Sequence, residues 1–134
     1  MLIRTASVTC LLVATAACSS GSSFAQPSAQ DFSPGACRVL AAPVLQLGRE
    51  LHGLGSKAPS TSQAEAITSS QGKVRTLQPA LPSQLAPAVQ DLVTAVGVLR
   101  LRNDTNDYDK SLQQQAMTAY RTVVAACTAK SNHS

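Results

Sequence analysis

The side chains in this sequence with the clearest capacity for chemistry are its cysteines and histidines. They are Cys10, Cys18, Cys37, Cys127, His52 and His133. Nucleophilic catalysis requires a Ser or Cys beside a base that a third group orients. We expect neither a Gly-x-Ser-x-Gly elbow nor a Ser-x-x-Lys motif to accompany either histidine. We interpret His52 as a surface residue near the C-terminal end of a helix, where the helix dipole favours it. We therefore predict no catalytic residue and a protein that is not an enzyme.

A polar run at residues 103–109, Asn-Asp-Thr-Asn-Asp-Tyr-Asp, has the alternating oxygen ligands of a calcium loop. Such a loop also needs a glycine at its sixth position and a bidentate glutamate at its twelfth. Here those positions hold Tyr108 and Gln114, so we interpret the run as a turn that caps the following helix. We expect Cys18 to be lipid-modified and Cys37 to be oxidised in a disulfide, which leaves no thiolate pair for zinc. We predict neither a metal ion nor another cofactor.

Residues 1–17 have the properties of a signal peptide. Arg4 supplies a positive charge, and residues 6–16 form an uncharged apolar stretch that is shorter than the roughly 20 residues of a membrane span. The stretch ends in Val-Ala-Thr-Ala-Ala-Cys at residues 13–18. This segment resembles the bacterial lipobox, in which two small residues precede a cysteine that receives diacylglycerol. It departs from that pattern at Thr15, where leucine is usual.

The resemblance implies that Cys18 is lipid-modified and holds the protein on the extracytoplasmic face of a membrane. Residues 18–32 are rich in Ser, Gly, Ala, Gln and Pro, and we expect them to form a disordered tether. In tether and alanine content, the chain resembles small envelope lipoproteins of actinobacteria. One alternative remains open: residues 23–25 form a small-x-small site, and cleavage before Gln26 would give a freely secreted protein.

Composition favours an all-α fold. Apolar residues make up 44% of the chain, aromatic residues only 3%, and there is no tryptophan. Such a composition suits closely packed helices better than a β-sandwich. The net charge is +4, and its basic residues are scattered, so we predict no nucleic-acid partner. The charge favours, at most, anionic surfaces such as phospholipid or wall polymer.

Four helical segments are expected in a domain spanning residues 33–130, followed by a polar tail at 131–134. The first runs from Cys37 to Leu54 with apolar residues every three or four positions, and Pro43 should kink it or separate its first turn.

The other three segments also carry terminal signals. The second should open with a capping box at residues 62–65, Ser-Gln-Ala-Glu. The third should start at Pro82 or Ser83, and the fourth should be capped by Asn106 together with Asp109.

Short connections between four amphipathic helices predict an up-down-up-down antiparallel four-helix bundle. In that topology the start of the first helix lies beside the end of the last, which places Cys37 beside Cys127. Export would bring both cysteines into an oxidising compartment. We therefore predict one disulfide between the first and last helices.

Several residues lie off the main apolar stripes of the last two helices and form a possible interaction surface. They are Val98, Arg100, Leu101, Arg102, Tyr120 and Val124. The alternative is that these residues only widen the core stripes.

The function that these features favour is a non-enzymatic, envelope-anchored module that binds another component of the cell envelope, expected to be a protein. A secreted carrier of a small apolar ligand or of haem is one alternative, with His52, Tyr108, Met117 or Tyr120 as the axial ligand. A prophage-type surface lipoprotein that blocks phage or a lytic enzyme is another. A small enzyme that depends on His52, or on carboxylates that the fold brings together, is a third.

Overall fold

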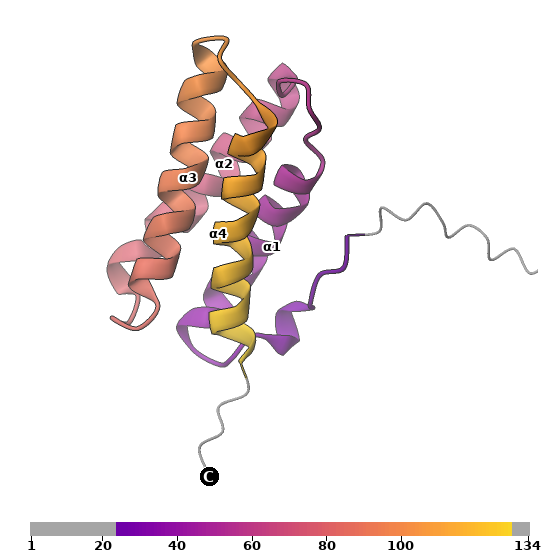
Figure 1. Cartoon of the computed structure of the whole chain (residues 1–134). Helices are drawn as coiled ribbons and strands as arrows, with labels where there is room; N and C mark the ends of the chain where they lie inside the picture. Colours follow the sequence, from indigo (N-terminus) through magenta and orange to yellow (C-terminus); the bar gives the residue numbers. More distant parts are fainter. Residues whose placement is uncertain (1–23, 130–134) are drawn as a thin grey trace, which may run out of the picture.

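The computed structural model describes residues 24–129, and every regular element among them is helical. Figure 1 shows the helices, which are α1 (Ala36–His52), α2 (Thr61–Leu77), α3 (Ala86–Asp104) and α4 (Lys110–Thr128), with two short 3-10 turns, η2 (Ala29–Asp31) and η3 (Gln78–Ala80). The prediction of an all-α chain with four helices is confirmed. The expected signal peptide (1–17), the lipidated Cys18 and the tail (131–134) lie outside the described residues.

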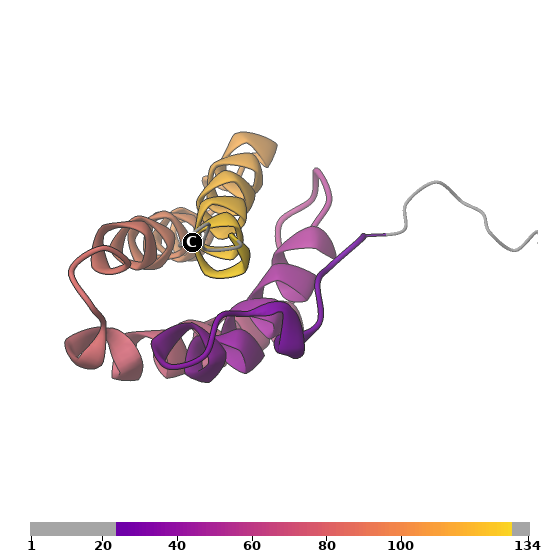
Figure 2. The ribbon, with the colours of Figure 1, turned by 90° about the horizontal axis from the view of Figure 1, so that it is seen from below.

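The helices pack around one shared core. α1 contacts α2 and α4, and α3 contacts the same two helices. Viewed from below, α1 and α2 form one side of the bundle and α3 and α4 the other (Figure 2). Each helix contributes aliphatic side chains that are fully buried, among them Leu47, Ile67, Leu92, Val96 and Val123.

Bonds at both ends of α1 join it to α4. The predicted disulfide between Cys37 and Cys127 is confirmed, with the two Cα atoms 5.3 Å apart. Beside it, the backbone N–H of Ser33 donates to the carbonyl of Cys127 at 2.8 Å. At the other end, Gln113 Nε2 donates to the carbonyls of Leu51 and Leu54 at 3.0 and 2.9 Å. The start of α1 therefore lies beside the end of α4, and the end of α1 beside the start of α4.

Two helix starts differ from the prediction. α2 is capped by Ser60, whose hydroxyl accepts from Gln63 N at 3.2 Å while the Gln63 side chain accepts from Ser60 N at 2.9 Å. The box predicted at residues 62–65 is wrong, because the same motif occurs two residues earlier and its use lengthens the helix. α3 begins at Ala86 rather than at Pro82 or Ser83, because residues 82–85 form a hydrogen-bonded turn.

α4 and α1 also depart in detail. Asp109 alone caps α4, with its carboxylate accepting from Ser111 N at 2.6 Å. Asn106 is not a cap; it adopts a φ of 58° in the preceding turn, a left-handed conformation that Asn tolerates better than most residues. α1 is not split, since it continues as one helix through Pro43.

The predicted disorder of residues 18–32 is wrong for residues 24–32, which pack across α1 and α4. We call this segment the N-terminal strap. The ring of Phe24 stacks on His52 with centroids 4.4 Å apart, and Phe32 is only 1% exposed. The chain has only two phenylalanines and both lie in the strap. Because large aromatic side chains bury much apolar surface, they hold this otherwise polar segment on the bundle.

Candidate interaction surface

Helix α3 carries an apolar pair on its outer face. Val98 is 40% exposed and Leu101 is 63% exposed, and their spacing of three residues places them one turn apart. Elsewhere on the helix, Leu92, Val96 and Leu99 point into the core. The side chains of Val98 and Leu101 are therefore surplus to the packing of the bundle.

The two arginines predicted on this surface have partners within the protein. Arg100 donates to the side-chain oxygen of Gln71, and Gln71 Nε2 donates to the carbonyl of Val93 at 2.9 Å. Gln71 is 3% exposed, so this relay satisfies a buried amide between α2 and α3. Arg102 Nε pairs with Asp107 Oδ2 at 2.7 Å. Both guanidinium groups are restrained, one between two helices and one at the turn that follows α3.

Tyr120 does not belong to an exposed surface, and its assignment there is wrong. It is 3% exposed, and its hydroxyl accepts a hydrogen bond of 2.8 Å from Gln26 Nε2 in the strap. Burial raises the pKa of Tyr120, an effect that the bond from Gln26 and the charges of Arg49 and Arg121 partly offset. Val124 is half-buried and packs against the core. Tyr120 is buried because the strap covers α4 on the side where Tyr120 lies.

The side chains considered as haem ligands are each engaged within the protein. His52 stacks on the first aromatic ring of the strap, and Met117 is buried in the core. The hydroxyl of Tyr108 donates to the carbonyl of Gly55 at 3.0 Å, and burial raises the pKa of Tyr108. Within residues 24–129, no three His, Cys, Asp or Glu side chains lie close enough together to hold a metal ion.

The acidic run at residues 103–109 forms the end of α3 and the turn before α4. Asp109 accepts hydrogen bonds from the backbone and the hydroxyl of Ser111, and these bonds lower the pKa of its carboxyl group. Its role in the structure is the cap of α4.

Ser70 and Lys73 have the spacing of a Ser-x-x-Lys motif, so the expectation that the chain offers none is wrong. The structure places Ser70 in the middle of α2, 3% exposed, where its hydroxyl donates to Glu50 Oε1 at 3.0 Å. The side chain of Lys73 is exposed. Ser70 thus serves as a buried polar contact between α2 and α1.

One shallow hollow of about 460 Å³ lies between the start of α2 and the end of α3. Its lining includes Ser60, Thr68 and Asn103 together with the carboxylates of Glu65 and Asp104. The hollow is polar on the α3 side and contains no basic residue.

The contacts that hold the strap against α1 and α4 are the feature that the sequence did not predict. Gln26 bridges α1 and α4, because Nε2 donates both to the carbonyl of Leu45 at 2.9 Å and to Tyr120, while Oε1 accepts from Arg49 at 3.2 Å. Gly48 leaves the room for this close approach. The signal in the sequence was the presence of both phenylalanines in a segment that was otherwise typical of a linker.

Comparison of the chain with protein-family models, with curated proteins and with solved structures found no match. Among the helices of residues 24–129, none combines the length and the hydropathy that crossing a bilayer requires.

Proposed function

We propose that this protein is a lipid-anchored component of a bacterial cell envelope and that its helical bundle binds another envelope protein without catalysing a reaction. The observation that carries the binding role is the exposed pair Val98 and Leu101 on the outer face of α3. An apolar pair outside the core is available for burial by a partner, and such burial is the main source of affinity at interfaces.

The proposed address is supported by the sequence before the bundle and by the disulfide. Small residues precede Cys18 in the manner of a lipobox, and a polar segment follows it. A structural disulfide such as Cys37–Cys127 is stable in the oxidising compartments outside the bacterial cytoplasm. Both features are those of an exported protein.

We further propose that the bundle has the up-down-up-down antiparallel topology. Support comes from the bonds that join opposite ends of α1 and α4, and from the contacts of each helix with two others. The connections after α1, α2 and α3 are short, as this topology requires.

The anchor is tested by the intact mass of the protein from its membrane fraction, beside a Cys18→Ala variant. We expect a membrane-bound species that begins at an acylated Cys18, and loss of membrane attachment in the variant. A soluble native species that begins at Gln26 would contradict the anchor and favour free secretion.

The binding role is tested by a photo-reactive amino acid placed at Leu101 in living cells of the native host. We expect one discrete crosslinked protein, with a lower yield when Val98→Ser is added. The matched control carries the probe at Thr76, an exposed polar position on α2. Equal labelling from both positions would contradict a binding surface on α3.

A further inference from the structure

We propose that the N-terminal strap turns the α1–α4 side of the bundle toward the membrane, where its basic side chains lie against anionic phospholipid headgroups. This inference rests on the proposed lipid anchor at Cys18. The anchor alone leaves the orientation of the bundle open, whereas the proposed orientation specifies the face and the residues that contact the lipid.

The reach of the anchor limits how the bundle can lie. Six peptide units separate Cys18 from Phe24, and a fully extended chain of that length spans about 20 Å. α4, with its 19 residues, is about 28 Å long. An acylated Cys18 therefore holds Phe24 closer to the membrane surface than the length of one helix of the bundle.

The strap transmits this constraint because it is bonded to both helices. Phe24 stacks on His52, and Gln26 is bonded to Leu45 and Tyr120. Figure 1 shows the chain leaving the bundle from the flank of α1. The side chains around this exit point are therefore the ones that a short anchor brings to the lipid.

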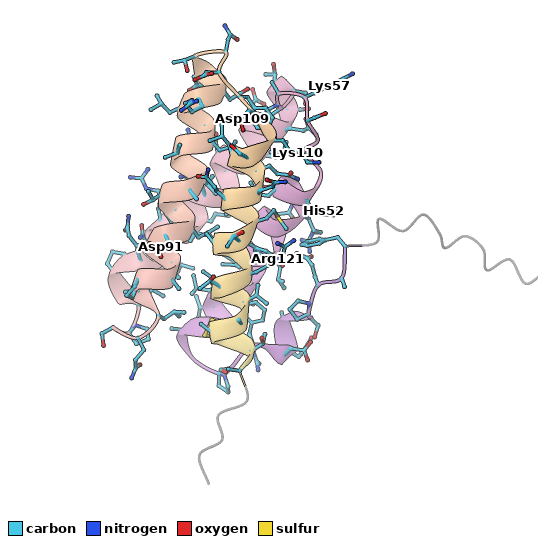
Figure 3. All side chains as sticks on the ribbon, in the orientation of Figure 1. His52, Lys57, Asp91, Asp109, Lys110 and Arg121 are labelled. Carbon is cyan, nitrogen blue, oxygen red and sulfur yellow. A yellow bond between two sulfur atoms is a disulfide. The ribbon has the colours of Figure 1, made fainter. Side chains whose placement is uncertain are left out.

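Exposed cationic and imidazole groups lie on α1, on α4 and in the connection after α1. They are Arg49, His52, Lys57, Lys110 and Arg121. Figure 3 shows the last four of these, together with Asp109, on the half of the view that holds α1 and α4, with Lys57 at its upper end, whereas Asp91 lies on α3. Over residues 24–129 the one ion pair joins Arg102 to Asp107, so none of these cations is paired with a carboxylate.

This side holds three carboxylates, which are fewer than its five lysines and arginines, Arg38, Arg49, Lys57, Lys110 and Arg121. Asp31 accepts from the backbone and hydroxyl of Ser28 at the lower end of the strap, and Asp109 caps α4. Glu50 points toward α2, where it accepts from Ser70.

The α2–α3 side is different, because its cations are matched by an equal number of carboxylates. They are Lys73, Arg75, Arg100 and Arg102, and Glu65, Asp91, Asp104 and Asp107. An anionic surface therefore attracts the α1–α4 side more strongly than the α2–α3 side.

The test uses the mature acylated protein in vesicles of phosphatidylcholine, with or without phosphatidylglycerol. A photo-reactive amino acid is placed at Thr118, one turn before Arg121 on the same face of α4, or at Asp91 on α3. We expect crosslinking to lipid from position 118 and not from 91, and a higher yield with phosphatidylglycerol. Each cation near an anionic surface changes binding by about five-fold, so Lys110→Gln with Arg121→Gln should lower that yield by at least about five-fold.

The matched control is Lys73→Gln with Arg75→Gln, which removes the same charge from exposed positions of α2. Lipid crosslinking of equal yield from positions 118 and 91, or equal losses in the two double variants, would overturn the orientation while leaving the anchor intact. Failure of the anchor is recognised separately, as a protein whose mass shows no acyl group and which does not sediment with either kind of vesicle.

Discussion

Gly48 is placed where the strap, α1 and α4 meet. A Cβ atom on this residue would lie 2.5 Å from Tyr120 Cζ and 2.9 Å from Gln26 Nε2. The Tyr120 side chain is buried and its hydroxyl is bonded, so it has little room to retreat. Glycine at this position therefore allows the strap to be seated.

Gly48→Ala should destabilise the protein by about 1 to 3 kcal/mol, because overpacking outweighs the better helix propensity of alanine. Gly72→Ala is the control, since no atom lies within 4 Å of the added Cβ in α2. The free energy of unfolding of that variant should rise by about 0.5 to 1 kcal/mol. Urea unfolding followed by circular dichroism measures both, and a stabilised Gly48→Ala protein would show that the strap is not seated as described.

Tyr120 should make the stability of the protein sensitive to alkaline pH. Burial raises the pKa of Tyr120 in the folded state, so the folded protein keeps a proton that the unfolded chain loses above pH of about 10. The free energy of unfolding should therefore be fully present below that pH and fall as the pH rises through the folded pKa. Tyr120→Phe should flatten this decline when urea unfolding is repeated across an alkaline series. If the free energy of unfolding falls with pH equally steeply in the Tyr120→Phe variant, then Tyr120 has the same pKa in the folded and unfolded states.

The helices differ in how far buried apolar side chains, rather than polar contacts, hold them in the bundle. α2 buries two polar residues, Ser70 and Gln71, and depends on bonds to Glu50 and Arg100 of its neighbours. Its capping box at Ser60 is therefore important for its first turn.

Ser60→Ala should lower the free energy of unfolding by about 1 kcal/mol, because it removes the acceptor for Gln63 N. Ser62→Ala, inside the first turn, should change stability by less than about 0.5 kcal/mol. Thermal unfolding of the two variants side by side gives the answer. The reverse order of effects would place the cap at Ser62.

The number and approximate range of the helices could be predicted because apolar residues recur at helical spacing along each of them. The starts could not, because the capping motif occurs twice near α2 and because turn residues such as Asn106 also suit caps. The pairing of Cys37 with Cys127 followed from their positions at the start of the first helix and the end of the last. The burial of Tyr120 did not, since it depends on a segment whose composition is that of a linker.

The molecule as a whole is closed by the disulfide, which joins residues 90 positions apart. Chain-entropy estimates give such a long loop about 4 to 5 kcal/mol of stabilisation, comparable to the net stability of a small domain.

Reduction should therefore move the urea midpoint of the protein sharply downward, and Cys37→Ala with Cys127→Ala should reproduce that shift without reductant. Protein that is alkylated without prior reduction serves as the control. A midpoint that is the same with and without reductant would contradict this account of the stability.

The same bond determines what happens after proteolytic attack. The connections after α1, α2 and α3 all lie between Cys37 and Cys127, so a single cut in any of them produces two fragments that remain covalently joined. The C-terminal fragment stays linked, through Cys127, to the fragment that carries the N-terminus. A nicked molecule would keep all four helices covalently joined until a reductant released the fragment that carries Cys127.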